Sequence, residues 1–197
     1  MTALPEEKRY TYADLLSWEG DVRYELYDGY PMAMSSPSLD HQTVSGELFL
    51  QIGTYLRGKK CRVFYAPFDV RIFEQDGDLP QDVRTVLQPD LLVVCDPKKL
   101  DERGVRGAPD LVVEILSDST RRVDLLKKFD IYQRAGVREY WIVDPEAHTV
   151  TVHTLEDGKY RSPAATYRAD ASVPVGVLEG FQVDLRTVFP ELEQEEE

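Results

Sequence analysis

The chain has 197 residues, of which 42% are hydrophobic and 30% charged, and its formal net charge is −13. This length and composition predict one globular domain that buries its core without metal or disulfide staples. The sequence contains no apolar run near the ~20 residues of a membrane span, and its first residues lack the basic-then-apolar pattern of a secretion signal. We therefore expect a cytoplasmic protein with no membrane partner.

The net charge disfavours a nucleic-acid partner, because phosphate binding is driven largely by Lys and Arg. The basic side chains are nevertheless clustered. Residues 98–128 hold eight basic and six acidic side chains, and a second basic cluster lies at 57–62. Acid is concentrated in the tail 191–197, for which we expect no function.

The two cysteines, Cys61 and Cys95, have neither metal-ligand spacing nor a disulfide framework. Both lie in apolar, strand-like runs, so we expect buried free thiols.

The first 60 residues predict two helices and a hairpin. Thr11 and Asp14 have the spacing of a capping box, which indicates a short helix over 11–16. Residues 23–32 alternate and contain the Asp-Gly turn of a hairpin. From residue 39 the apolar positions recur at helical spacing, and Gly58 is a plausible end to that helix.

Three strands are predicted next, over 61–73, 86–95 and 111–116. The third is a nearly continuous apolar run, which is typical of a central strand covered on both faces. Pro89 lies inside the second strand and predicts a bend beside Asp90. Residues 96–108, basic and glycine-containing, are expected to form a mobile loop.

A helix over 123–135 that ends at Gly136, a buried strand over 139–145 and a C-terminal hairpin complete the pattern. The order helix, strand, strand, strand, helix, strand predicts an α/β core with a mixed sheet, flanked by β-hairpins. We expect one domain over 1–190, followed by the acidic tail. It divides into an N-terminal helix and hairpin (1–38), the core (39–145) and a C-terminal β-extension (146–190).

Two predicted strands each carry a carboxylate, Asp90 and Glu114. Magnesium prefers oxygen ligands and usually takes one or two carboxylates while keeping several waters. Asp90 and Asp110 each follow a proline, and Pro-Asp is also an ordinary turn pair. Glu114 stands inside a buried strand, where a carboxylate is costly unless it binds a metal or forms a structural salt bridge. Asp110 shares a strand face with Glu114 and is a secondary candidate.

Lys128 is the candidate cation of this site. It follows Asp124 by four residues, so an exposed ion pair on the helix surface is the alternative. Lys128 flanks the apolar stripe of its helix and could reach over the sheet. Lys127 is the competing candidate.

Three further residues could assist. Glu47 lies on the first long helix, His41 stands near that helix's start, and Glu25 lies in the predicted hairpin. Each has an ordinary alternative as an exposed helix residue, a capping residue or a strand residue. The three histidines are not at metal-ligand spacings, so we do not expect a zinc site.

The residues taken together resemble a known family, and the resemblance covers nearly the whole chain. It is carried by Tyr24 to Gly29, Ser36-Pro37, His41-Gln42, Gln88-Pro89-Asp90, Pro109 to Ser117, Ser119-Thr120, Asp124, Lys128, Tyr132, Ala135 to Val137 and Glu139 to Pro145. In these segments the chain is similar to the Uma-two family of the PD-(D/E)XK restriction-endonuclease-like superfamily. That resemblance implies the α/β core described above.

The resemblance also implies the roles of the site residues. Asp90 takes the place of the motif aspartate and Glu114 that of the first acid of the Glu-x-Lys element. Leu116 stands where the lysine of that element would be, and Lys128 on the following helix is the matching position.

We therefore expect an endonuclease that hydrolyses DNA with Mg²⁺, or Mn²⁺ in its place, bound by Asp90 and Glu114. Because one site cuts one strand, we also expect a homodimer. The alternative is an inactive protein that keeps the nuclease fold as an interaction module. It predicts that the carboxylates do not converge or that Lys128 faces solvent.

Overall fold

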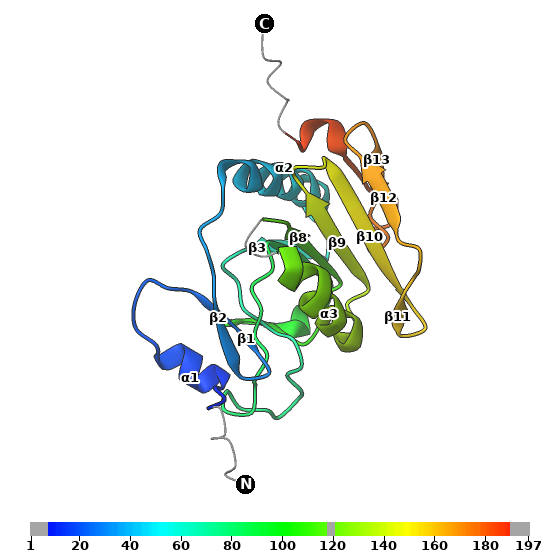
Figure 1. Cartoon of the computed structure of the whole chain (residues 1–197). Helices are drawn as coiled ribbons and strands as arrows, with labels where there is room; N and C mark the ends of the chain where they lie inside the picture. Colours follow the sequence, from blue (N-terminus) through cyan, green and yellow to red (C-terminus); the bar gives the residue numbers. More distant parts are fainter. Residues whose placement is uncertain (1–7, 118–120, 190–197) are drawn as a thin grey trace, which may run out of the picture.

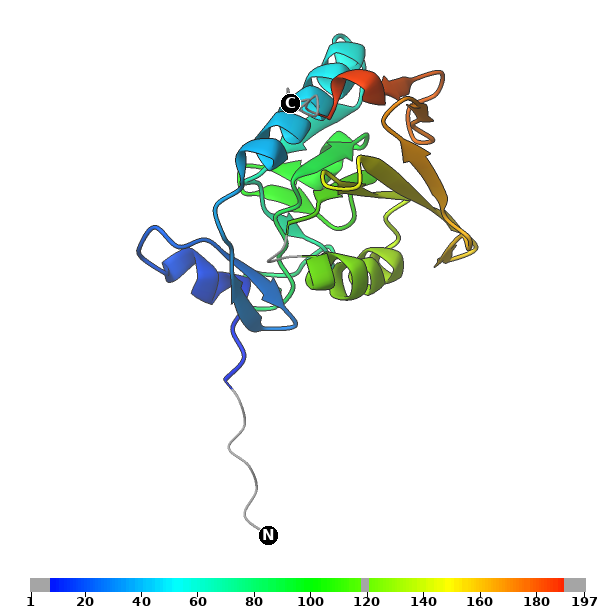
Figure 2. The ribbon, with the colours of Figure 1, turned by 45° about the horizontal axis from the view of Figure 1, so that its top comes forward.

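The computed structural model describes residues 8–117 and 121–189. One large β-sheet lies between two helices, which cover its opposite faces (Figures 1 and 2). The helix predicted from residue 39 forms as α2, Leu39–Leu56, with Ser38 as its N-cap. The second begins as a π-helical segment, η2 (Val123–Lys128), and continues as α3 (Phe129–Ala135).

The large sheet has seven strands in the order β11-β10-β9-β8-β5-β3, with β12 pairing with β10. Strands β8 and β9 are parallel and the other pairs are antiparallel, which confirms the predicted mixed sheet. The strands are β3 (Arg62–Tyr65), β5 (Leu91–Val94), β8 (Leu111–Ile115), β9 (Glu139–Asp144), β10 (Thr149–Glu156), β11 (Lys159–Tyr160) and β12 (Ala165–Arg168).

The two sheet faces follow from the alternation of side chains along a strand. In β5 and β8, odd-numbered residues join the core beneath α2, and even-numbered residues join the core beneath α3. Both strands are fully buried, as a near-continuous apolar run predicts. The α2 side includes Val44, Leu48, Ile52, Leu91, Val93, Leu111 and Val113, and the α3 side includes Leu92, Val94, Val112, Ile131 and Tyr132.

The N-terminal elements form as predicted. Helix α1 (Tyr12–Ser17) begins at the capping box of Thr11 and Asp14. The hairpin consists of β1 (Tyr24–Tyr27) and β2 (Tyr30–Ala33), joined at Asp28-Gly29. Leu26 and Val86 exchange backbone hydrogen bonds at 2.8 and 2.9 Å, which ties the hairpin to the segment leading into β5.

Residues 61–73 and 96–108 differ from expectation. The first segment is not one strand, because β3 ends at Tyr65 and β4 (Val70–Arg71) belongs to another sheet. The predicted mobile loop instead forms η1 (Pro97–Lys99), β6 (Leu100–Asp101) and β7 (Gly104–Arg106).

Strands β4, β7 and β6 pair into a small three-stranded sheet. Its basic residues are paired rather than exposed to a ligand. The buried Arg71 forms ion pairs with Glu74 and Asp101, and Arg106 bonds the same Glu74 at 2.8 Å. The pairs of Arg71 with Asp101 and of Arg106 with Glu74 join distant positions and order the segment.

The prediction of free thiols is wrong, because Cys61 and Cys95 form a disulfide. The β3–β5 register pairs Arg62 with Val94 and so places the cysteines opposite each other, with Cα atoms 3.9 Å apart. Disulfides are rare in the cytoplasm, so the cytoplasmic location remains a prediction. No helix in the described part of the chain is long and apolar enough to span a membrane.

The C-terminal segment packs beside α2 and the outer strands (Figure 1). It contains β13 (Ser172–Pro174), β14 (Gln182–Asp184) and η3 (Leu185–Thr187). The buried carboxylate of Glu139 accepts hydrogen bonds from Trp141 Nε1 and Val177 N at 2.6 and 3.0 Å, joining β9 to this segment. The division of the domain remains a prediction, and the acidic tail lies outside the described residues.

Gly104 offers a test of the small sheet. A Cβ atom there would lie 2.1 Å from the backbone oxygen of Asp69, whereas one at Gly77 would meet nothing within 4 Å, and both glycines have positive φ. We expect Gly104→Ala to lower the free energy of unfolding by at least ~2 kcal/mol more than Gly77→Ala. Urea denaturation measures the difference, and equal losses would contradict the steric assignment.

Candidate active site

The sheet register brings the two predicted carboxylates to one end of the sheet. Antiparallel pairing of Leu91 with Val113 places Asp90, directly before β5, beside Glu114 near the end of β8. Oδ2 of Asp90 accepts a hydrogen bond from the backbone N–H of Ile115 at 2.7 Å. Asp90 is therefore fixed against the strand that carries Glu114.

Lys128 reaches these carboxylates from the helix covering the sheet. Its Nζ lies 2.9 Å from Oε1 of Glu114, 3.2 Å from Oε1 of Glu25 and 3.4 Å from Oδ1 of Asp124. Its side chain is 5% exposed, so the alternative of an exposed pair with Asp124 is wrong. Lys127 points elsewhere, with its Nζ 5.8 Å from the ring centroid of Tyr27.

His41 lies in the first turn of α2 beside Asp90. Its Nε2 is 3.2 Å from Oδ2 of Asp90, and its side chain is 12% exposed. The interpretation of His41 as a surface residue is therefore wrong. Its Nδ1 is buried and has no hydrogen-bond partner among the described residues.

Glu25 enters the site from hairpin strand β1. Its Oε1 accepts a hydrogen bond from the backbone N–H of Gln88 at 2.8 Å, and its Oε2 accepts one from the Tyr27 hydroxyl at 2.5 Å. Together with Lys128, these donors engage both oxygens of the buried carboxylate.

The side chains of Asp90, Glu114, Lys128, His41 and Glu25 form one group. The structure places Glu47 and Asp110 away from it. Oδ2 of Asp110 accepts a hydrogen bond from Cys95 N at 2.7 Å, and Oδ1 pairs with Arg138 at 3.2 Å, so Asp110 joins strands at the start of β8. Ser45 of α2 faces the site, and Glu47, two residues on, is turned ~200° around the helix. These two candidates are not part of the group.

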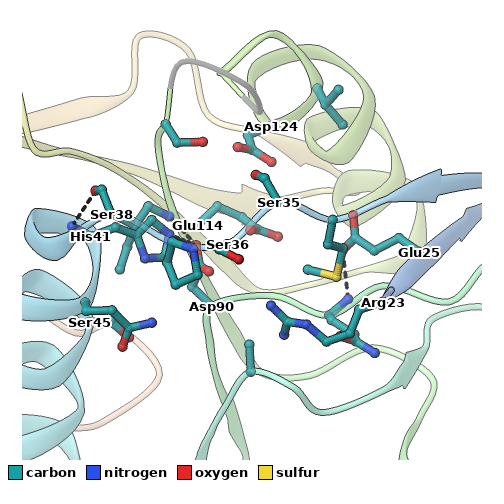
Figure 3. Close-up of a pocket in the computed structure, with 18 of the residues that line it drawn as sticks. Arg23, Glu25, Ser35, Ser36, Ser38, His41, Ser45, Asp90, Glu114 and Asp124 are labelled. Atoms are coloured by element: carbon teal, nitrogen blue, oxygen red, sulfur yellow. Dashed lines mark hydrogen bonds and ion pairs between the residues drawn. The ribbon is translucent and has the colours of Figure 1, made fainter. Parts of the chain in front are cut away.

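The group lines a cavity of about 610 Å³ (Figure 3). Its walls come from the hairpin, the segment 34–38, the start of α2, the ends of β5 and β8, and η2. Among the described residues that line it, two permanent cations, Arg23 and Lys128, are outnumbered by six carboxylates. These belong to Glu25, Asp40, Asp90, Glu114, Asp124 and Glu146.

Burial and neighbouring charges shift the pKa values of the buried groups. Burial raises the pKa of Glu114, the charge of Lys128 lowers it, and those of Asp124, Asp90 and Glu25 raise it, so that the net shift is well upward. Burial lowers the pKa of Lys128, but Glu114 and Glu25 outweigh it and raise that pKa well above its ordinary value. Lys128 is therefore a firmly charged ammonium surrounded by more negative charge than it balances.

His41 is shifted in the same direction by the same charges. Burial lowers its pKa, whereas its contact with Asp90, the charge of Asp124 and the backbone of Ile115 raise it, and the net shift is upward.

Some residues in or beside the cavity were not identified as site residues from the sequence. Asp124 and Tyr132 were named only as part of the resemblance and, for Asp124, as a surface partner of Lys128; the Tyr132 hydroxyl donates to Oε1 of Glu114 at 2.6 Å. Asp124, Lys128 and Tyr132 are spaced four residues apart, and this spacing could have indicated a shared face. No spacing pattern in the sequence indicated that Arg23 would line the cavity. Ser119 and Thr120, part of the resemblance, lie outside the described residues.

Comparison with known proteins shows the family to which the chain belongs. Residues 11–186 match the model of Uma2, described as "Putative restriction endonuclease". The chain belongs to the Uma2 family. Its match covers most of the chain, including every residue that lines the cavity.

Two other proteins are similar to this member of the Uma2 family. "Uncharacterized protein slr1290" of Synechocystis sp. strain PCC 6803 is 27% identical over 151 residues, or 75% of each chain. A crystal structure from Anabaena variabilis, "a putative nuclease belonging to DUF820", gives a TM-score of 0.71 at 19% identity. The match covers 91% of this chain and 97% of that one, and it establishes the shared fold.

The raised pKa of Glu114 predicts how the substitution Glu114→Gln affects stability. Below the ordinary pKa of glutamate the group is protonated in both folded and unfolded states. Between that value and the raised folded-state pKa, the wild type loses stability as pH rises, because ionisation is disfavoured only in the folded state. Glu114→Gln lacks this loss.

The melting temperature of Glu114→Gln relative to wild type should therefore rise between pH 5 and pH 8. Thermal unfolding in a chelator measures it. Glu47→Gln, outside the cavity, is the control and should show no such trend. A Glu114→Gln difference that stays constant with pH would contradict the raised pKa.

Proposed function

We propose that this protein is an endonuclease that hydrolyses DNA phosphodiester bonds with Mg²⁺, or with Mn²⁺ in its place. Asp90 and Glu114 are its metal ligands, and Lys128 is its catalytic cation. The observation that carries the proposal is the buried contact of Lys128 with Glu114, at 2.9 Å beside Asp90. It supplies the ammonium that Leu116 cannot provide from the strand.

The carboxylates fit a magnesium ion by their chemistry and charge. Within the described residues, protein hydrogen bonds reach only Oδ2 of Asp90 and Oε1 of Glu114, which leaves one oxygen of each for a cation. The described residues contain no group of three or more His, Cys, Asp or Glu arranged around a metal. Mg²⁺ does not need one, because it usually takes one or two carboxylates and keeps its waters.

When bound, Mg²⁺ supplies a polarised phosphoryl oxygen and a water of lowered pKa. The chain's own residues orient the metal ligands and stabilise the transition state. Lys128 provides positive charge for the negative charge that develops on the phosphate in the transition state. Asp90 is held in place by Ile115 N and His41. Residues 34–38 form part of the cavity wall beside these groups, and charges interact more strongly where the protein replaces water.

An inactive interaction module is the rival function. It expects either that the carboxylates do not converge or that Lys128 faces solvent, and this lysine is buried among carboxylates. Buried charge is costly to keep in a scaffold that has no use for it. The arrangement therefore favours the catalytic proposal.

The DNA partner is supported by the second basic cluster. Arg57, Lys59, Lys60 and Arg62 are exposed, and they form no ion pair with an acid in the described ranges. The cluster lies at the far end of α2, about 18 Å along the helix axis from Ser45 at the cavity wall. It can contact the phosphate backbone of a duplex whose scissile bond reaches the cavity.

We also propose a homodimer, because one site cuts one strand and a twofold axis would supply the second. Sedimentation equilibrium with and without duplex DNA measures the stoichiometry. A monomer that nicks single strands would contradict this part alone.

Neighbouring lysines provide a matched test of the catalytic role. Lys128→Met and Glu114→Ala should each lower Mg²⁺-dependent cleavage of supercoiled plasmid by at least ~100-fold, because each removes a charge from the proposed transition-state or metal site. Lys127→Met changes the adjacent exposed lysine and should retain activity within about twofold.

Glu114→Ala leaves Lys128 with two carboxylate partners, Glu25 and Asp124, so it should remain folded by circular dichroism. A folded Glu114→Ala variant that cleaves at the wild-type rate would sink the assignment. Wild-type protein without cleavage on supercoiled, linear and single-stranded DNA would favour the rival.

A further inference from the structure

Glu25 differs from Asp90 and Glu114 in that the protein's hydrogen bonds reach both of its carboxylate oxygens. Oε1 accepts from Gln88 N at 2.8 Å and lies 3.2 Å from Lys128 Nζ, while Oε2 accepts from the Tyr27 hydroxyl. A carboxylate whose two oxygens both bind protein donors is poorly placed to bind a metal. Besides these hydrogen bonds, Glu25 forms an ion pair with the ammonium of Lys128.

The position of Glu25 is fixed from two sides. Within hairpin strand β1, its neighbour Leu26 exchanges backbone hydrogen bonds with Val86. Two residues after Val86, Gln88 donates its own N–H to Glu25. The hairpin is thus joined to the segment that enters β5 and carries Asp90. Figure 3 shows Glu25 on the hairpin side of the cavity, with Asp90 and Glu114 nearer His41 and α2.

This placement bears on the role of Lys128. If Glu114 were its only strong partner, the ammonium would neutralise the carboxylate that the metal needs. Glu25, at 3.2 Å, offers the ammonium a second buried carboxylate, and Asp124, at 3.4 Å, a third. A lysine that is shared among three carboxylates can stay charged in the cavity while one oxygen of Glu114 binds a cation.

We propose that Glu25 is the positioning residue of Lys128, and that the N-terminal hairpin is therefore part of the catalytic apparatus. Glu25 acts through the lysine and does not bind the metal. It holds the ammonium beside Glu114 and keeps it from competing with the metal for that carboxylate. This inference rests on the proposed function, because it assumes a cation at Asp90 and Glu114.

The substitution Glu25→Gln tests the proposal, because glutamine keeps the size and one acceptor oxygen but removes the charge. Partners that orient a metal ligand typically change metal affinity 10–100-fold when altered. We expect Glu25→Gln to weaken Mn²⁺ binding, measured by isothermal titration calorimetry, by roughly tenfold. The kcat for DNA cleavage should fall, while the KM for DNA stays within about twofold.

A second background separates positioning from ligation. In the Lys128→Met protein, no ammonium competes for Glu114, so adding Glu25→Gln should change Mn²⁺ affinity by less than about twofold. A metal-ligating Glu25 would instead cost similar affinity in both backgrounds, and that outcome would overturn the proposal.

Tyr27→Phe is the matched control for packing. It removes the hydroxyl bond to Glu25 but keeps the carboxylate charge and its contact with Lys128. Because the carboxylate charge and the lysine contact remain, Tyr27→Phe should lose clearly less Mn²⁺ affinity than Glu25→Gln. Equal losses in Tyr27→Phe and Glu25→Gln would show that only the packing of the hairpin matters, and would overturn the proposal.

The two proposals fail in distinguishable ways. A wild-type protein that binds no Mn²⁺ overturns the proposed function and this inference with it. A wild type that binds Mn²⁺ and cleaves DNA, beside a folded Glu25→Gln variant with the same affinity and kcat, overturns only the role of Glu25.

Discussion

The ammonium of Lys128, buried among the carboxylates of Glu25, Glu114 and Asp124, is the interaction on which the rest of the site depends. A lone charge in a protein interior is costly. Three carboxylates stabilise the buried ammonium, but together they carry more negative charge than it neutralises. Two tyrosine hydroxyls, from Tyr27 and Tyr132, donate into the same group. The cavity therefore has an excess of negative charge that favours binding of a cation. The formal net charge of the whole protein is also negative, at −13.

The sheet makes this concentration of charge possible. Asp90 and Glu114 sit at one end of two antiparallel strands whose other residues are apolar and fully buried. The two strands pair through their backbones, and the side chain of Asp90 accepts the N–H of Ile115 at the end of β8. The helix carrying Lys128 packs on one face and the start of α2, with His41, closes the site beside Asp90. The fold thus brings together groups that lie far apart in the sequence.

Much of this arrangement could be predicted from local patterns. Glu114 was identifiable because a carboxylate in a run of buried aliphatic residues demands a partner, and the order of helices and strands followed from periodicity. What failed depended on pairing between distant segments. The register of β3 against β5 joins Cys61 to Cys95, and salt bridges from Arg71 order residues that looked like a loop. Neither register nor ion pairing is written in local composition.

The hydrogen bonds between the hairpin and the segment before β5 have a consequence for the boundaries of the unit. A chain shortened to begin at residue 39 would keep the large sheet, both covering helices, Asp90, Glu114 and Lys128. It would also open the lysine to water and leave the Gln88 N–H without its acceptor. The smallest piece able to fold and the smallest piece able to work need not coincide here. A fragment without the hairpin would leave Lys128 with Glu114 and Asp124 as its carboxylate partners.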